Sequence, residues 1–222
     1  MAGVYPQMAL AAWIATDDFS SGYTDDTSVD GIDGGTNWDA WAASENKYTA
    51  ETVTALDGHS QYGVYAVILS TDASVNRTIT STQTTGVFRM FVRRTDKTLG
   101  RQTFGLHNAS DRMWFFRMGT ADIIFTDGPT IVSSYNVNQW YKLDISFNTD
   151  TDLAKARVDC GDWSADTGAE TVGGAISFFR MNATESGTGI FYFDDFADGD
   201  DCAVASADAE PFRELIFFYN EV

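Results

Sequence analysis

Positive charge is scarce in this sequence. It has 14 lysines and arginines against 32 aspartates and glutamates, which gives 222 residues a formal net charge of −18 at pH 7. A field of that sign repels phosphate, so we expect no nucleic-acid partner. The longest apolar runs are far short of the ~20 residues that span a bilayer, so we also expect no membrane insertion.

Cysteine, histidine and proline are also few, at 2, 2 and 3 residues. Two cysteines are too few for a disulfide framework, and the histidines form no Cys/His metal cluster. Two alternatives stay open for Cys160 and Cys202: small buried thiols, or one bridge that pins the C-terminal segment to the domain. We interpret His107, within Gly-Leu-His-Asn, as a polar residue at a strand end.

Alternation of apolar and polar residues dominates the rest of the sequence. In 140–147 the odd positions from Tyr141 to Phe147 are apolar and the even positions after Trp140 are polar. In 86–94 the same period points Phe88 inward and Arg89 outward. No segment shows a sustained 3.6-residue period. We expect strands at 47–55, 62–70, 75–80, 86–94, 102–108, 112–118, 122–126, 140–147, 154–160, 174–181 and 189–196.

Many short strands with one apolar face predict an all-β fold, a two-sheet antiparallel β-sandwich with N- and C-terminal extensions. We divide the chain into an N-terminal arm (1–15), a jelly-roll domain (16–196), and an acidic linker with a C-terminal apolar strand (197–222). The arm lacks the positive start of a secretory signal, so we expect it to be retained. A strand apolar on both faces must be buried on both, so we expect partner-binding residues at Trp13, Leu215, Ile216, Phe217, Phe218 and Tyr219.

Four motifs in a fixed order resemble those of the concanavalin A-like lectin/glucanase superfamily, especially laminin-G-like jelly rolls. They are Asp-Asp-Phe at 17–19, a Gly-Gly loop with two tryptophans at 34–41, Trp-Tyr-Lys-Leu at 140–143, and Tyr-Phe-Asp-Asp-Phe at 192–196. The resemblance covers about residues 16–196. It implies a lectin-like sandwich of the kind found in phage structural proteins, in bacterial surface proteins and in accessory modules of glycan-degrading enzymes.

A calcium site is one interpretation of the acids at the two ends of this domain. The first and last strands of a jelly roll are neighbours, so Asp17 and Asp18 can converge with Asp194 and Asp195. Clustered carboxylates repel one another unless a cation such as Ca²⁺ neutralises them. The alternative is that one aspartate of each pair caps a turn and the other faces water.

We expect no catalysis. The catalytic branch of the superfamily uses two glutamates on one strand around an aspartate, and glycoside hydrolysis needs two carboxylates ~5 Å apart. Only Glu210 and Glu214 have a comparable spacing, and Pro211 stands between them without an aspartate.

Glycan binding is the activity that the resemblance favours, because a sugar ring has one apolar face that stacks on an aromatic ring. Trp163, with Asp162 beside it, lies in a predicted turn and is our first candidate for that stacking. Arg112 and Trp114 form a second candidate pair. We interpret Trp38, Trp41 and Trp140 as core residues.

Two functions of different class follow. The first is a structural and interaction protein of a virus-like particle, such as a phage capsid-decoration, fibre or tail component. It would be made in the host cytoplasm, located in the virion, and bound to capsid subunits or to its own copies as a homo-oligomer. The second is a free carbohydrate-binding module, extracellular or on a bacterial cell surface, that mediates adhesion through cell-surface glycans.

Overall fold

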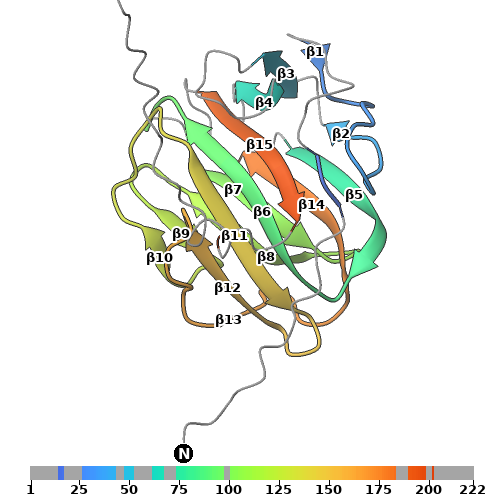
Figure 1. The fold of residues 1–222 in the computed structure, drawn as a ribbon, viewed down its shortest axis with the longest axis vertical. Helices are drawn as coiled ribbons and strands as arrows, with labels where there is room; N and C mark the ends of the chain where they lie inside the picture. The colour runs from blue at the N-terminus through green and yellow to red at the C-terminus, as the bar shows by residue number, and fades with distance from the viewer. Residues whose placement is uncertain are drawn as a thin grey trace, which may run out of the picture.

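Two antiparallel sheets packed face to face make up the fold of this computed structural model (Figure 1). It describes residues 15–17, 27–43, 48–52, 62–67, 74–97, 101–183, 190–198 and 202. Every regular element of that part is a strand, and no helix in it is long or apolar enough to cross a membrane. The predicted all-β sandwich is therefore confirmed.

The larger sheet has eight strands. Their order across the sheet is β1 (Thr27–Ser28), β3 (Tyr48–Thr52), β4 (Tyr62–Val67), β15 (Ile190–Asp198), β6 (Thr85–Arg94), β11 (Tyr141–Asn148), β12 (Leu153–Val158) and β13 (Thr167–Gly168). The other sheet has seven, in the order β10 (Thr130–Val132), β9 (Ile123–Phe125), β8 (Arg112–Met118), β7 (Gln102–His107), β14 (Ile176–Ala183), β5 (Ser74–Gln83) and β2 (Ala42–Ala43). Crossovers between the sheets bring strands that are distant in sequence side by side.

The core fills the space between the sheets with the inward residues that alternation predicted. Tyr141, Leu143, Ile145 and Phe147 of β11 are all buried. From the opposite sheet, the Trp114 ring lies 5.9 Å from that of Phe147. Full burial of each such side chain contributes roughly 1.5–3 kcal/mol, so this layer is the main source of stability. Ala15, which we assigned to the arm, is fully buried in the same core.

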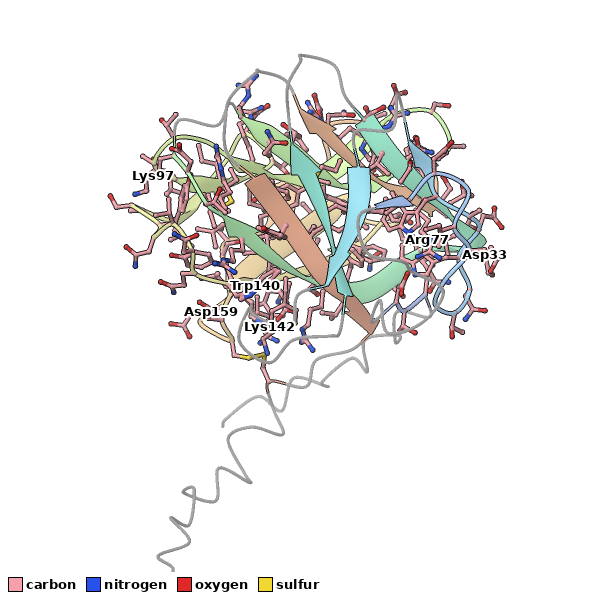
Figure 2. All side chains as sticks on the ribbon, turned by 90° about the horizontal axis from the view of Figure 1, so that it is seen from above. Asp33, Arg77, Lys97, Trp140, Lys142 and Asp159 are labelled. Carbon is pink, nitrogen blue, oxygen red and sulfur yellow. A yellow bond between two sulfur atoms is a disulfide. The ribbon has the colours of Figure 1, made fainter. Side chains whose placement is uncertain are left out.

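One end of the sandwich is closed by the 27–43 segment around a buried arginine (Figure 2). Arg77 of β5 donates hydrogen bonds to the Asp17 carboxylate and to the Gly34 carbonyl oxygen. Its guanidinium lies 5.5 Å from the ring centroid of Trp38 and 5.0 Å from that of Trp41. The two tryptophans are buried, as predicted. The first two motifs of the resemblance therefore build a structural plug.

Gly35 is the residue that lets this plug close. Its φ of +73° is in the left-handed region, and a Cβ there would lie 2.3 Å from the Thr16 carbonyl oxygen. Thr16 and Thr36 exchange backbone hydrogen bonds of 3.0 and 2.7 Å at this point. Only glycine allows so close an approach, so any larger residue would push the 15–17 segment away from Arg77.

Candidate functional site

The outer face of the seven-stranded sheet carries a grid of side chains set by strand register. The first row runs from β5 to β8 through Thr78, Phe178, His107 and Arg112. The second row is Asn76, Arg180, Gly105 and Phe115, and the third is Ser74, Asn182, Thr103 and Arg117. Their neighbours along each strand, such as Phe179 and Leu106, are in the core. The grid therefore presents alternate residues of four strands on the face away from the core.

Gly105, at the centre of the grid, allows β8 to approach β7 closely. A Cβ at this position would lie 2.8 Å from the Phe115 Cβ and 2.5 Å from its Cα, so the backbone of β8 leaves no room for one. The fully buried Phe115 ring lies on this side of the sheet, with the Arg112 guanidinium 3.9 Å from its centroid. Glycine at position 105 thus allows Phe115 to pack against the centre of the grid.

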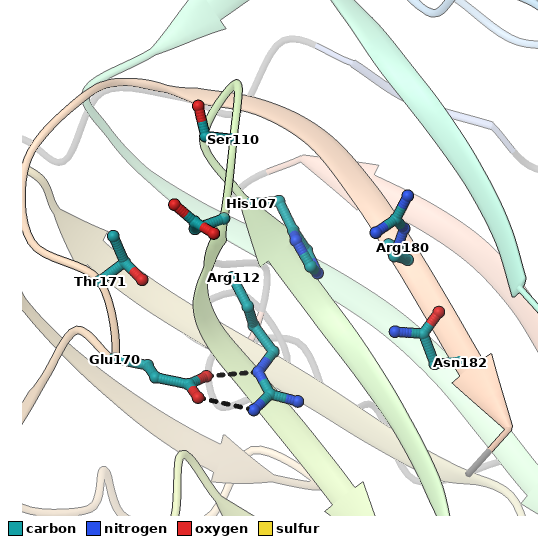
Figure 3. Close-up of a pocket in the computed structure, with 8 residues that line it drawn as sticks. His107, Ser110, Arg112, Glu170, Thr171, Arg180 and Asn182 are labelled. Carbon is teal, nitrogen blue, oxygen red and sulfur yellow. Dashed lines mark hydrogen bonds and ion pairs between the residues drawn. The ribbon is translucent and has the colours of Figure 1, made fainter. Parts of the chain in front are cut away.

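The same face contains a cleft of about 270 Å³. His107, Arg112, Glu170 and Arg180 line it together with Ser110, Asp111, Thr171 and Asn182 (Figure 3). Arg112 and Glu170 lie on one side of His107, and Arg180 and Asn182 lie on the other. Arg112 holds Glu170 in a two-pronged ion pair in which its Nη2 donates to Oε1 at 2.8 Å.

A second groove of about 470 Å³ adjoins the first, with Ser110 and Arg180 lining both. Its other lining residues are Asn76, Thr78, Ala109, Ser177 and Phe178. The half-buried Phe178 ring is the apolar surface here, and the polar residues surround it. One aromatic face bordered by hydroxyl, amide and guanidinium groups is the chemistry that fits a sugar ring.

The rim of the cleft is held by the turn between β7 and β8. Asn108 Oδ1 accepts hydrogen bonds from the backbone N–H groups of Ser110 and Asp111 at 2.9 and 2.7 Å. Asn108 Nδ2 donates to the Gly173 carbonyl oxygen at 3.0 Å, which ties this turn to the 170–174 loop. The Glu170 N–H donates to the Met113 carbonyl oxygen at 2.9 Å. The cleft is therefore formed before any ligand arrives.

His107 forms the floor between the two sides. It ends β7, as predicted for a polar residue at a strand end, and its ring stacks on Phe178 with centroids 4.7 Å apart. Burial above all, and then the positive charges of Arg180 and Arg112, lower the pKa of His107 from 6.5 to about 3. At neutral pH its ring is therefore uncharged and serves as a flat, weakly polar surface.

Arg180 differs from the other arginines of this face. Arg112 and Arg117 pair with Glu170 and Asp127. Within the described residues Arg180 has no ion pair, and its buried Nε has no hydrogen-bond partner. Ser177 Oγ, which lines the adjoining groove, is also buried without a partner. These two groups mark where a polar ligand would complete the site.

Of the second predicted pair, Arg112 lines the cleft, but Trp114 as a sugar-stacking residue is wrong. Trp114 is fully buried in the core, where no sugar can reach it. The register shifts at this point, because Arg112 pairs with His107 while Trp114 pairs with Leu106. Met113 is the extra residue of this β-bulge, so two residues expected on one face lie on opposite faces.

Trp163 and Asp162 lie over the other sheet and outside this cleft. Asp162 is exposed, and the half-buried Trp163 ring has the Arg157 guanidinium carbon 4.2 Å from its centroid. Trp163 thus covers an arginine of β12, and its role in sugar binding stays a prediction. Trp140, which we assigned to the core, is half-buried outside it, 6.3 Å from Tyr192.

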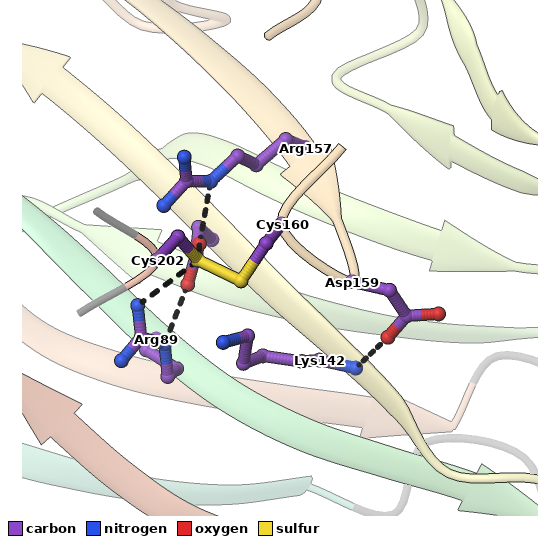
Figure 4. Close-up of a disulfide and its surroundings, with 7 residues drawn as sticks. Arg89, Lys142, Arg157, Asp159, Cys160 and Cys202 are labelled. Carbon is purple, nitrogen blue, oxygen red and sulfur yellow. Dashed lines mark hydrogen bonds and ion pairs between the residues drawn. A yellow bond between two sulfur atoms is a disulfide. The ribbon is translucent and has the colours of Figure 1, made fainter. Parts of the chain in front are cut away.

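Beneath Trp163 lies a buried cluster on the outer face of the eight-stranded sheet (Figure 4). Arg89 Nε and Arg157 Nε donate to the two oxygens of Asp144 at 2.8 and 2.7 Å. Cys160 and Cys202 form a disulfide, and the Cys202 Sγ lies 3.7 Å from Asp144 Oδ2. The bridge is thus the alternative that the structure adopts. Arg89, expected to face outward, does so but is buried in this cluster.

The predicted calcium ligands are only partly described. The buried Asp17 carboxylate is ion-paired with Arg77, which already neutralises it. Asp18 lies outside the described residues, and the structure does not describe the side chains of Asp194 and Asp195 in β15. In the described part, no three acidic, cysteine or histidine residues form a group that could hold a metal ion. The calcium site stays a prediction.

The partner-binding residues Trp13, Leu215, Ile216, Phe217, Phe218 and Tyr219 also lie outside the described residues. So does the Glu210 and Glu214 pair. β15 ends at Asp198, close to the boundary of 196 that we expected for the jelly-roll domain.

Comparison with known proteins bears on the fold alone. No protein-family model matches the sequence, and no curated protein matches it. A solved sialidase is similar with a TM-score of 0.54 at 9% identity, over 71% of this chain and 18% of that chain. The binding domain of botulinum neurotoxin DC in complex with SialylT gives 0.51 at 12% identity, over 89% of this chain and 50% of that chain.

A Caenorhabditis elegans galectin is also similar, with a TM-score of 0.42 at 13% identity, over 61% of this chain and 96% of that chain. The present chain thus spans under a fifth of the sialidase and half of the neurotoxin chain. At these identities the likenesses to the sialidase and to the neurotoxin binding domain show the fold alone, a two-sheet jelly roll, which agrees with the fold that the four motifs implied.

Proposed function

We propose that this chain is a non-catalytic carbohydrate-binding sandwich that holds saccharides in the cleft over β14, β7 and β8. The observation that carries the proposal is the preformed grid, in which Phe178 offers an apolar ring and Arg180, Asn182 and Asn76 offer polar groups around it. This is the division of roles that a sugar needs, with one apolar face and a rim of hydroxyls. The fold shared with a toxin binding domain supports a binding role.

The acids of the cleft support binding over hydrolysis. Glycoside hydrolysis requires one carboxyl group that donates a proton and a second that attacks or activates water. Of Asp111 and Glu170, both of which line the cleft, Glu170 accepts hydrogen bonds from Arg112 on both oxygens. With both oxygens engaged by Arg112, Glu170 is held away from the role of a catalytic acid, which supports binding over hydrolysis.

A glycan array probed with the purified chain, with and without calcium, tests the binding role. We expect binding to a defined set of saccharides, weakened at least tenfold by Phe178→Ala because the stacking surface is lost. Ser177→Ala, at the same groove, changes less of the fold and should weaken binding about threefold. Silence across the array under both conditions would remove the proposal.

Trp163→Ala is the matched control, because Trp163 is also a half-buried aromatic residue but lies over the opposite sheet. Binding retained in this variant and lost with Phe178→Ala keeps the site in the cleft. The reverse result would move it to Trp163 and Asp162, where the sequence alone had placed it.

We further propose that the domain serves as a structural or interaction protein of a virus-like particle, located in the virion and bound to other subunits or to its own copies. The net charge of −18 and the apolar run from Leu215 to Tyr219 support this setting. Deletion of 212–222 should abolish incorporation or oligomerisation and leave a folded sandwich. A monomeric full-length chain by light scattering would argue instead for a free binding module at a cell surface.

A further inference from the structure

The cleft contains a positive charge that no carboxylate of the described residues neutralises. On the outer face of the seven-stranded sheet, Arg112 and Arg117 each hold a carboxylate. Among the described residues Arg180 holds none, although acids outnumber bases by 32 to 14 in the sequence. An unpaired guanidinium in so acidic a chain is not explained by packing, because surplus carboxylates are abundant.

The environment of Arg180 increases the cost of leaving it without a ligand. Its Nε is buried and has no partner, and the guanidinium carbon lies 5.5 Å from the Phe178 ring centroid. The neighbouring His107 is uncharged at neutral pH, so it neither repels nor neutralises the Arg180 guanidinium. The buried Nε is a donor without a partner, so a ligand in the cleft that accepts a hydrogen bond from it would satisfy this donor.

We propose that Arg180 binds the carboxylate of an acidic saccharide, and that sugars bearing one carboxylate per binding unit are the ligand class of this cleft. The inference rests on the proposed glycan binding and names the class of sugar that the cleft selects. A planar guanidinium forms two parallel hydrogen bonds with a planar carboxylate. The ammonium group of a lysine, which acts as a point charge, does not form this matched pair. The Phe178 ring beside it takes the apolar face of the same sugar.

Charge around the cleft limits the ligand to a single negative group near Arg180. Asp111 and Glu170 line the same cleft, and the whole chain is strongly acidic. A saccharide with several sulfates would meet these acids as well as Arg180. A single carboxylate would pair with Arg180, the one cation of the cleft without an ion pair among the described residues. The sugar hydroxyls would then contact Ser177 Oγ, which is buried without a partner, and the side chains of Asn76 and Asn182 in the adjoining register positions.

The test compares sugars that differ only in charge. Sialyllactose and a glucuronate-containing tetrasaccharide are titrated calorimetrically against the full chain, beside lactose and the carboxyl-reduced tetrasaccharide. We expect at least one acidic sugar to bind ten times more tightly than its neutral counterpart at 50 mM salt. The preference should shrink at 500 mM salt, where charge interactions are screened.

Arg180→Gln should abolish the preference, so that the acidic sugar binds no more tightly than its neutral counterpart, and Arg180→Lys should retain part of the preference. Arg93→Gln is the matched control, because it removes the same charge from β6 of the opposite sheet, where the guanidinium reaches Asn138 Oδ1 at 3.4 Å. We expect it to leave the preference unchanged. Circular dichroism of each variant confirms that it is folded.

The possible failures are distinguishable. Equal binding of acidic and neutral sugars, or a preference that survives Arg180→Gln, would overturn the inference while the glycan-binding function stands. Tighter binding of a sulfated analogue than of the carboxylated sugar would overturn the ligand class. If neither acidic nor neutral sugars bind, both the inference and the proposed function fail.

Discussion

On each outer face of this sandwich, two strands that flank a common neighbour carry arginines, and the two faces satisfy these arginines in opposite ways. Over the eight-stranded sheet, Arg89 and Arg157 share the buried Asp144, and the Cys160–Cys202 bridge covers all three. Over the seven-stranded sheet, the Arg112 pair is partly exposed and Arg180 opens into a cleft.

The difference separates charge used for structure from charge available to a ligand. A guanidinium sealed under a covering segment has lost its water, so it must find an acid within the protein. A guanidinium that lines a cleft can exchange water for a ligand and needs no internal partner. The same residue type on the same kind of strand therefore has two roles, and the covering segment decides between them.

We call the outer face of the eight-stranded sheet the closed face and the outer face of the seven-stranded sheet the open face. The largest expected effect comes from breaking the buried Arg89, Asp144 and Arg157 cluster on the closed face. Asp144→Ala leaves Arg89 and Arg157 buried without their shared acid, and we expect about 3–5 kcal/mol of lost stability. Urea denaturation measures it. Asp127→Ala is the matched control, because it removes the partner of Arg117 from the open face, where an exposed pair contributes about 0.2–1 kcal/mol. Equal losses in the two variants would contradict the distinction between the faces.

Removing the disulfide that covers this cluster should cause the next largest loss of stability. Cys202→Ser removes a bridge between residues 42 apart in sequence, for which chain entropy predicts a loss of about 2–4 kcal/mol. Denaturation with and without reductant measures it, and the variant should show no further loss on reduction. Saccharide binding should stay within twofold of the original, because the cleft lies on the other sheet. A large loss of binding would mean that the two faces are coupled.

Most of the architecture follows from the sequence because a half-buried strand must alternate. The expected strand at 86–94 is β6, observed at Thr85–Arg94, and 112–118 is β8. The two-residue strands β1, β2 and β13 were not predicted, because segments so short carry no period. They form through pairing with a neighbour that the sequence does not indicate.

The cleft could be predicted only in part. His107 and Arg112 were singled out from their local sequence, but Arg180 and Asn182 were missed. Their significance comes from register, which sets Arg180 opposite Gly105, 75 positions earlier in the chain. The signal available was the alternation in 176–183, which points Phe178, Arg180 and Asn182 to one side. The bulge at Met113 has no comparable signal, and it moved Trp114 to the opposite face.

Acid should weaken the open face through His107. Its pKa is about 3 in the folded chain and about 6.5 in the unfolded one, so the unfolded state binds a proton first as pH falls. The stability that neutral His107 provides is complete above pH 6.5 and is lost progressively toward pH 3. Between pH 7.5 and 5 this amounts to about 2 kcal/mol.

His107→Gln removes this titration, and comparison with the original chain cancels the contributions of the carboxylates. The difference in unfolding free energy between the two proteins should narrow by about 2 kcal/mol from pH 7.5 to pH 5. Denaturant titrations at intermediate pH values measure it. A difference that stays constant with pH would show that His107 is not the buried neutral base that its position on Phe178 and near Arg180 implies.

The smallest change in stability is expected from Glu170→Gln, yet this variant tests the open face most directly. The Arg112 and Glu170 side chains are 28% and 40% exposed, so breaking their pair should alter stability by only about 0.5 kcal/mol.

The Glu170→Gln variant also frees a second guanidinium at the cleft and removes one negative charge. If Arg180 binds a carboxylate, the acidic saccharide should bind about two- to fivefold more tightly at 50 mM salt, with a smaller gain at 500 mM. Calorimetry on the acidic and neutral sugars separates the effects. Weaker binding of both would mean that Glu170 itself accepts hydrogen bonds from sugar hydroxyls, so that its pair with Arg112 positions a ligand contact.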